Sequence, residues 1–397
     1  MQAPLKLVRI TTVPLSMRLL ITGQPHYMQK SGFDVTLVSS EGVEDWAAIP
    51  ELHRFKIEKV NMARQIALLQ DVKSLWQLIQ LFRKIRPHIV HSHTPKAGLL
   101  GMMAAFIAGV PVRIHTLAGL PMMTASGVKR TILAWAERCT YFFAQQVWVN
   151  GKQLKSFVEN EGLLPLRKSY MILNGSSNGI DLSTYHPDAL DDDRLLALQQ
   201  QYAFTARKFY FLAVGRVVKD KGIIELLRAF TQVHQQHLHT HLVLLGPLEQ
   251  HLDPIPDDCL QTLQSHPAIT HVHWSNEVAY FMQLSNCFIH ASHREGFPNV
   301  VLQAGAMGLP IVCSIIPGNT DIVENNNEGY LFEKGNEQAL LTQMLAVLHE
   351  PDVAQAKALA LQQKIRLQYD RVAVHQAIKE QYIYHLKQRG FDVSSIH

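Results

Sequence analysis

The chain has 397 residues, too many for one ordinary hydrophobic core, and this length predicts two domains of roughly 150–200 residues each. Hydrophobic residues make up 47% and charged residues 18%, which excludes a disordered or fibrous protein. The formal net charge of +4 divides unevenly, with +11 over residues 1–175 and −7 over the remainder. A basic first half favours an anionic partner, such as a membrane surface, a nucleic acid or a phosphorylated substrate; a merely soluble basic domain is the plain alternative.

The cysteines and the apolar runs bear on the compartment. The four cysteines are scattered without a Cys-x-x-Cys pair, as is typical of a reducing compartment. The first ten residues contain too short an apolar run for a signal peptide. The uncharged run over residues 98–112 is too short to cross a hydrocarbon core of about 30 Å. We therefore expect a cytoplasmic protein, at most peripheral on the inner face of the cell membrane.

Short β-branched runs alternate with helical patterns in both halves, which is typical of parallel sheets covered by helices on both faces. The pattern over residues 68–85 predicts a helix whose apolar residues Leu68, Leu69, Val72, Leu75, Leu78, Ile79 and Phe82 share one face. Strands are expected, in chain order, at residues 5–10, 34–39, 89–93, 112–116 and 146–149, and then at 209–214, 241–245, 272–274, 286–290 and 310–314.

The turn-rich segment Asn174–Asp181 predicts the domain boundary. We expect one Rossmann-like domain over residues 1–178, a second over 179–371, and a C-terminal helix within 372–397 that crosses back to the first domain. The fold class is thus α/β, with two Rossmann-like domains facing an interdomain cleft. Ligands of such sheets bind beyond the carboxyl ends of the strands, so the loops after strands are the candidate sites.

The strongest candidate is the segment HREGFPNVVLQ, residues 293–303. It follows an expected strand, and Pro298 favours a helix start there, so the amides of Asn299, Val300 and Val301 would form an anion site. Glu295 stands just outside this helix and can accept hydroxyl hydrogen bonds. The alternative is an ordinary capped helix with a solvent-facing glutamate.

The second candidate is GRVVKDKG, residues 215–222, directly after another expected strand. Gly215 permits a sharp turn, Arg216 offers a bidentate fork to a phosphate, and Lys221 adds a point charge near the next helix. A basic solvated turn is the alternative for this loop alone. Two anion-seeking loops at the same edge of one sheet favour a diphosphate ligand.

The segments EGFPNVVLQAGAMGLPIV, GRVVKDKG and GNTDIVENNNEGYLF resemble glycosyltransferase family 4, the retaining GT-B enzymes. HSHTPKAGLLG and HTLAGLP resemble the bacterial surface-polysaccharide members, and the resemblance covers nearly the whole chain. It implies a metal-independent hexosyltransferase, without a cofactor, that moves a sugar from a nucleotide diphosphate donor, expected to be UDP-linked, to a lipid-linked or saccharide acceptor. The second domain would bind the nucleotide-sugar and the first domain the acceptor.

The resemblance also implies roles for particular residues. Arg216 and Lys221 would neutralise the donor diphosphate, and Glu295 would face the transferred sugar; these three are the implied catalytic residues. The segment around Trp274–Glu277 would lie near the nucleotide base. The full implied donor set is Gly215, Arg216, Lys221, Glu295, Gly296, Phe297, Asn299, Val300 and Gln303.

Two positions depart from the family pattern. Gln303 stands where the family has a second glutamate that holds the ribose; an amide can still bind hydroxyls, but without charge assistance. Ala118 stands where the family has a histidine that reaches the donor sugar, and His115 on the same strand would point to the opposite face. We interpret Ala118 as a change in sugar specificity.

For the acceptor we expect contacts with Arg18, Thr94, Lys96 and Gly119, on loops of the first domain. Ser16 is the expected N-cap of a helix that begins near Met17. The basic side chains Arg64, Lys73, Arg83, Lys84 and Arg86 would attract an anionic membrane surface, and no nucleic-acid partner is expected. No metal is expected either: the pairs His91/His93, His239/His241 and His271/His273 lack a third ligand at metal spacing, and Asp191–Asp193 is interpreted as a solvated loop.

Two rival functions remain open. A GT-B nucleotide-sugar 2-epimerase would turn over the donor without an acceptor. A non-catalytic sugar-nucleotide-binding protein is the second, because Gln303 and Ala118 depart from the family pattern. The presence of Arg216, Lys221 and Glu295 argues against a loss of catalytic activity. The absence of a Gly-x-Gly-x-x-Gly motif after any expected strand argues against a nicotinamide dehydrogenase.

Overall fold

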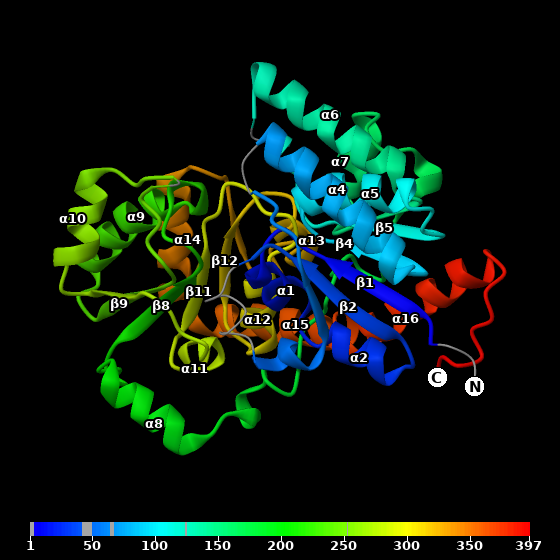
Figure 1. The fold of residues 1–397 in the computed structure, drawn as a ribbon. Helices are drawn as coiled ribbons and strands as arrows, with labels where there is room; N and C mark the ends of the chain where they lie inside the picture. Colours follow the sequence, from blue (N-terminus) through cyan, green and yellow to red (C-terminus); the bar gives the residue numbers. More distant parts are fainter. Residues whose placement is uncertain (1–3, 42–49, 64–66, 124, 252) are drawn as a thin grey trace. The chain divides into compact units, whose positions relative to one another are not determined.

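The chain folds into two compact units in the computed structural model, which describes residues 4–41, 50–63, 67–123, 125–251 and 253–397 (Figure 1). The first unit comprises Met1–Gly179 together with Val372–His397, and the second comprises Ile180–Arg371. Each unit is built on a single parallel sheet with helices on both faces. The C-terminal helix thus packs with the first unit, although the whole second unit precedes it in the chain.

The first unit contains a seven-stranded sheet in the order β3-β2-β1-β4-β5-β6-β7, and every pair is parallel. Its strands are β1 (Lys6–Ile10), β2 (Asp34–Ser39), β3 (Lys56–Lys59), β4 (Ile89–Ser92), β5 (Val112–Leu117), β6 (Gln146–Val149) and β7 (Ser169–Tyr170). Its helices are α1 (Pro14–Ile21), α2 (Gln24–Lys30), α4 (Leu68–Ile85), α5 (Pro95–Ile107), α6 (Gly127–Phe143), α7 (Lys152–Asn160) and α16 (Arg371–Lys387), with short 3₁₀ turns η1 (Pro50–Arg54), η2 (Pro121–Met123) and η3 (Leu166–Lys168).

The two faces of this sheet bury separate apolar clusters, because side chains alternate along each strand. Val8 and Ile10 of β1 join the cluster formed with α4, α5 and α6. Leu7 joins the opposite cluster, which includes Ile378 and Tyr382 of α16. Burial of these α16 side chains explains why the C-terminal segment returns to the first unit.

The second unit contains a six-stranded parallel sheet in the order β10-β9-β8-β11-β12-β13. Its strands are β8 (Phe209–Val214), β9 (Thr240–Leu245), β10 (Ile269–Val272), β11 (Cys287–His290), β12 (Ile311–Ser314) and β13 (Tyr330–Phe332). Its helices are α8 (Asp192–Gln201), α9 (Ile223–Gln236), α10 (Asp257–Ser265), α11 (Val278–Gln283), α12 (Asn299–Ala306), α13 (Asn319–Ile322), α14 (Glu337–His349) and α15 (Pro351–Gln368), with 3₁₀ turns η4 (Pro187–Ala189) and η5 (Lys219–Lys221).

The sequence predictions for the central strands are confirmed, and the errors lie at the sheet edges. β3, β7 and β13 were not expected, and β10 lies at Ile269–Val272 rather than at residues 272–274. All four are edge strands, which have one neighbour and bury less apolar surface, so their patterns are weak.

Two helix predictions are also corrected. α1 begins at Pro14 and its N-cap is Val13. Ser16 therefore lies inside the helix, and its amide donates a hydrogen bond to the carbonyl oxygen of Val13. α4 has the expected bounds, but its apolar residues do not share one buried face: Leu78 and Phe82 are buried, whereas Leu68, Leu69 and Val72 are exposed. Among the described residues, no helix is both long enough and apolar enough to span a membrane.

Candidate functional site

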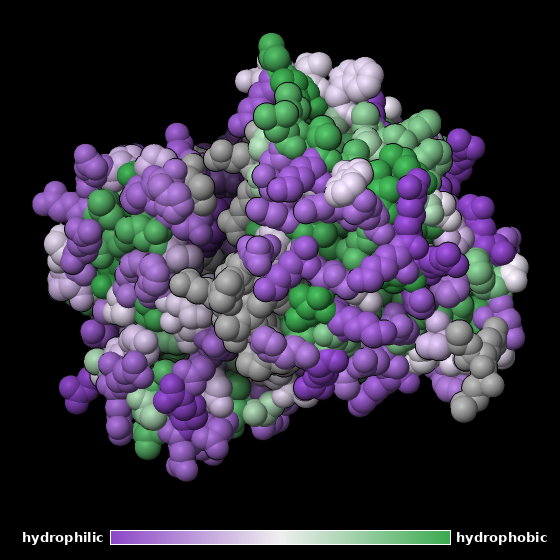
Figure 2. Space-filling view, viewed as in Figure 1, coloured by the Kyte–Doolittle hydropathy of each residue, from purple (hydrophilic) through white to green (hydrophobic). Residues whose placement is uncertain are grey.

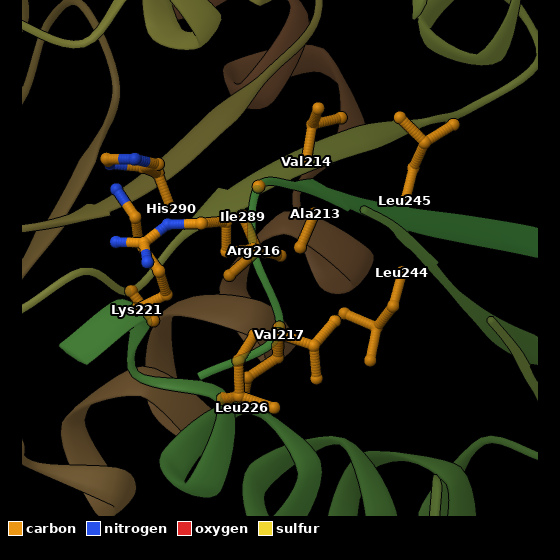
Figure 3. Close-up of a pocket in the computed structure, with 13 residues that line it drawn as sticks. Ala213, Val214, Arg216, Val217, Lys221, Leu226, Leu244, Leu245, Ile289 and His290 are labelled. Atoms are coloured by element: carbon orange, nitrogen blue, oxygen red, sulfur yellow. The ribbon is translucent and has the colours of Figure 1, made fainter. Parts of the chain in front are cut away.

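The loops after β8 and β11 form the centre of the candidate site in the second unit. These strands are neighbours in the sheet, and the chain leaves β8 toward β9 but leaves β11 toward β12. Ligands of open parallel sheets bind at such a switch point, beyond the carboxyl ends of the strands. A pocket lies there, and Figure 3 shows Arg216, Lys221 and His290 lining it beside apolar side chains from β8 and β9.

Gly222 allows the two loops to approach each other closely. Its φ is +67°, and a Cβ atom there would lie 2.0 Å from the carbonyl oxygen of Ala291, so only glycine fits. Hydrogen bonds join the same loops: the amide of His293 donates to the Asp220 carbonyl at 2.9 Å, and the Arg294 guanidinium donates to the Asp220 carboxylate at 2.9 Å. The loops therefore form one connected unit rather than two independent turns.

Lys221 and Glu295, both predicted from the sequence, form an ion pair at this junction. Their side chains are only 23% and 15% exposed, and His290 Nε2 lies 3.3 Å from the same carboxylate oxygen. Burial alone would raise the pKa of Glu295, but Lys221 and His290 outweigh burial and hold the pKa well below its usual range. Glu295 is therefore an anion at neutral pH, held by the Lys221 ammonium with the His290 ring beside it.

His290 and Asn319 were missed by the sequence analysis. Asn319 Nδ2 donates to the carbonyl oxygen of Ser314 at 2.9 Å, which fixes the amide orientation so that its Oδ1 accepts from His290 Nδ1 at 2.9 Å. His290 Nε2 is then directed at Glu295. The available signals were the position of His290 at the end of a strand and the GNTDIV segment, which contributed only to the overall resemblance.

Arg216 lies on the same side of the pocket as Lys221 (Figure 3). Its guanidinium pairs with Glu249 at 2.9 Å, and its side chain is 45% exposed. The φ of +151° at Gly215, in the region where side chains are strained, lets the chain turn directly after β8. An exposed arginine paired with one partly exposed carboxylate loses little when it exchanges that partner for a ligand phosphate.

The start of α12 differs slightly from the prediction. The helix begins at Asn299 with Pro298 as its N-cap, and the amide of Val301 donates to the Pro298 carbonyl at 3.1 Å, so the expectation of three free amides is wrong for Val301. Phe297 anchors the preceding loop, because its buried ring packs against Tyr369 with 5.7 Å between ring centroids. Gly296 lies against Gly318, where a Cβ atom would come within 2.5 Å of the Gly296 carbonyl oxygen.

Gln303 and Val300 lie on α12, and both are partly exposed. Trp274 is half exposed, and Glu277 pairs with Arg194 at 2.5 Å. Arg216 and Lys221 line the pocket and Glu295 pairs with Lys221, so these three predicted residues lie together in one site.

The candidate acceptor residues of the first unit lie near the ends of β1, β4 and β5. Thr94 occupies the N-cap position of α5 and accepts a hydrogen bond from the Thr12 amide at 2.9 Å. Lys96 pairs with Asp71 at 2.5 Å and is largely buried. Arg18 lies in α1, and Gly119 lies in the loop after β5. Thr94 and Lys96 therefore have structural partners of their own.

His91 and His93 belong to a buried polar network. His91 binds the hydroxyls of Tyr382 and Thr116 at 2.5 and 2.7 Å, and Arg9 donates to His93 Nε2 at 3.1 Å. Burial holds the pKa of both histidines well below the usual value. Within the described ranges, no cluster of three or more His, Cys, Asp or Glu side chains has the arrangement of a metal site.

Comparison with known families gives two matches along the chain. Residues 24–172 match the model described as "Glycosyl transferase 4-like domain", and residues 197–366 match "Glycosyl transferases group 1". The second match contains both loops of the candidate site.

Among curated proteins, the chain is similar to the capsular polysaccharide biosynthesis glycosyltransferase CapM of Staphylococcus aureus, with 32% identity over 87% of this chain and 88% of that protein. It is also similar to the UDP-Gal:alpha-D-GlcNAc-diphosphoundecaprenol alpha-1,3-galactosyltransferase of Escherichia coli, with 26% identity over 72% of this chain and 73% of that protein.

Among solved structures, Anabaena HepE in complex with UDP and glucose superimposes with a TM-score of 0.78, at 18% identity, over 96% of this chain and 100% of that chain. At this identity the likeness concerns the fold alone. This likeness, together with the two parallel sheets covered by helices, confirms the predicted GT-B fold.

Proposed function

Because the chain belongs to the group 1 glycosyltransferases, we propose that it transfers a sugar, with retention, from a UDP-linked donor to a lipid-linked diphosphate saccharide in surface polysaccharide synthesis. The observation that carries the proposal is the pair of cations, Arg216 and Lys221, at the switch-point pocket beside the fixed anion Glu295. Two cations beyond the carboxyl end of one strand can bind the two phosphates of a diphosphate, and a carboxylate beside them can accept hydrogen bonds from the hydroxyls of a sugar.

The donor diphosphate would displace Glu249 from Arg216 and lie between Arg216 and Lys221. The start of α12 would add its dipole, as helix N-termini do for phosphates. Gln303, in the second turn of that helix, would bind the ribose hydroxyls as a neutral amide. The complex of HepE with UDP and the UDP-Gal named for the Escherichia coli relative support UDP as the nucleotide.

The two cations would also assist the chemistry. As the bond between the anomeric carbon and the phosphate oxygen breaks, negative charge grows on the leaving diphosphate, and preorganised cations stabilise that charge. In the proposed reaction the acceptor oxygen attacks the same face, and the departing phosphate oxygen takes the acceptor's proton, so the products are the glycosylated acceptor and UDP. Glu295 would hold the transferred sugar, and no metal ion is needed when Arg216 and Lys221 carry this role.

A lipid-linked diphosphate acceptor is supported by the diphosphoundecaprenol substrate in the name of the Escherichia coli relative. We place this acceptor on the first unit, near Arg18, Thr94, Lys96 and Gly119. Lys96 would have to break its largely buried ion pair with Asp71 in order to bind the acceptor, so its contact costs more free energy than the others.

The test is a panel of UDP- and GDP-sugars, each incubated with the full chain in the presence or absence of a polyprenyl-diphosphate sugar, with free nucleotide and lipid product both measured. We expect one UDP-sugar to give acceptor-dependent UDP release together with an elongated lipid product. Donor turnover without acceptor would instead indicate an epimerase or a hydrolase. Tight nucleotide binding without turnover of any pair would indicate a binding protein.

A further inference from the structure

The helices α4, α5 and α6 form one layer on the first unit, in which α5 lies between the other two (Figure 1). This layer exposes apolar side chains that a water-facing surface does not need. On α6 the exposed residues fall three or four positions apart, with Cys139 partly exposed between the last two: Val128 (77% exposed), Ile132 (50%), Trp135 (66%) and Phe142 (70%). That spacing places them on one stripe along the helix.

The stripe points away from the protein core. The opposite face of α6 carries Ala134, Thr140 and Tyr141, which are buried. The first half of α4 presents a second exposed group, formed by Leu68, Leu69, Val72 and Trp76, with exposed fractions between 59% and 92%. Figure 2 shows apolar residues gathered over α6 and the adjoining helices, with hydrophilic residues interspersed among them. Exposed apolar side chains gathered on one layer in this way mark an interaction site.

Basic side chains flank the stripe on both sides. At about 100° per residue, Lys129 and Arg138 fall on either side of the line through Val128 and Trp135, and both are exposed. Arg138 also lines an open recess with Arg130, whose charge is paired with Glu161 at 2.7 Å. The polar border of the apolar stripe is therefore cationic.

Acidic groups hardly offset this charge. Residues 68–143 contain nine Lys/Arg and only two Asp/Glu. Asp71 is paired with Lys96, and Glu137 lies buried on the inner side of α6, where burial raises its pKa to about 7. The exposed cations Lys73, Arg83 and Lys84 of α4 remain on the same layer.

We propose that the exposed face of α4 and α6 docks on an anionic phospholipid bilayer, with the α6 stripe entering the interfacial region and Lys129 and Arg138 contacting headgroup phosphates. Apolar burial combined with flanking cations is the pattern of helices that lie in a membrane interface, and tryptophan favours that depth. Pairing with a second copy would instead bring the cations of both copies together. The contact depends on apolar side chains as well as on charge attraction. Arg64 lies outside the described residues and is not part of the docking surface.

This surface is separate from the donor site, so its test needs neither nucleotide nor acceptor, and its failure leaves the proposed transfer reaction intact. The full chain is mixed with vesicles of phosphatidylglycerol and phosphatidylcholine in equal parts, or of phosphatidylcholine alone, and flotation is measured at low and high salt. We expect binding to the anionic vesicles that weakens as salt rises.

Variants separate the two contributions. Ile132→Ser combined with Trp135→Ser should lower the vesicle partition coefficient by about tenfold or more, because two apolar side chains no longer enter the interface. Lys129→Glu combined with Arg138→Glu should abolish the preference for anionic vesicles. Leu238→Ser combined with Leu367→Ser, at more exposed sites on the second unit, is the control and should bind as the wild type does.

Fluorescence supplies an independent readout of depth. Brominated lipid chains should quench the emission of the bound wild type, and Trp135→Phe should remove part of that quenching while leaving vesicle binding nearly unchanged. Equal binding to both vesicle types, or wild-type binding by the serine variant, would overturn the proposal. A wild-type dimer that the serine variant converts to a monomer would assign the stripe to self-association instead.

Discussion

Replacing Lys221 by methionine tests whether the charge pair at the loop junction has the energetic role that its geometry indicates. Methionine retains most of the apolar stem but leaves Glu295 beside His290 without its ammonium partner. Exposed ion pairs contribute about 0.2–1 kcal/mol, whereas removing one partner of a fully buried pair costs about 3–5 kcal/mol. With side chains 23% and 15% exposed, this pair lies between the two, and we expect a loss of about 2 kcal/mol from the stability of the second unit.

The pH dependence gives the sign of the effect. In the wild type the pKa of Glu295 is held low, so its contribution is present above the ordinary glutamate pKa and is lost only as pH falls through the lower, folded-state value. Without Lys221 the carboxyl should protonate at higher pH, which relieves the unpaired charge. The stability difference between wild type and Lys221→Met should therefore shrink as pH falls below about 5.

The assay is native-state hydrogen exchange of β8 and β11 peptides by mass spectrometry, which reports on the second unit without treating the whole chain as two-state. Lys221→Met combined with Glu295→Gln should recover much of the loss, since the buried anion is gone. Arg228→Ala removes an exposed pair with Asp258 and should cost less than about 0.5 kcal/mol. A pH-independent loss, or a double variant no more stable than Lys221→Met, would refute the reasoning.

Three further predictions concern the same unit. Gly222→Ala should displace the loop junction and weaken UDP binding more than tenfold by calorimetry, because its Cβ would collide with Ala291. The control is Gly162→Ala, at φ +61° with open space around it. This variant should lose only about 1 kcal/mol of stability through backbone strain in urea unfolding, and it should bind UDP as the wild type does. Phe297→Ala should destabilise the second unit by about 3 kcal/mol in hydrogen exchange, and retention of wild-type protection would contradict its anchoring role. Gln303→Glu should tighten UDP binding severalfold through a charge-assisted bond to the ribose; a UDP-bound structure with residue 303 turned away would exclude that contact.

The sequence predicted the central strands and the two ligand loops because their signals are local. β8 is a continuous apolar run and β11 is apolar up to His290, and the glycine and basic residues of 215–222 directly follow β8. The edge strand β10 was misplaced because its residues Ile269 and Thr270 are only partly buried. Periodicity is a reliable guide where both faces of a strand are covered and a weak one elsewhere.

Other features depend on residues far apart in the sequence. The contact between His290 and Asn319 joins positions 29 residues apart, and no local pattern indicates it. The exposure of Leu68, Leu69 and Val72 could not be predicted either, because periodicity identifies an apolar stripe but does not say which part of it the fold covers.

The central claim is that Arg216 and Lys221 bind the diphosphate of the sugar donor, and calorimetry of UDP binding tests it most directly. Removing one charged hydrogen-bond donor costs about 1.5–3 kcal/mol, so Arg216→Ala should weaken UDP binding by roughly tenfold to a hundredfold. Uridine, which lacks the phosphates, should bind both proteins equally, and Arg228→Ala should bind UDP as the wild type does. Unchanged UDP affinity in Arg216→Ala, or an equal loss for uridine, would contradict the account.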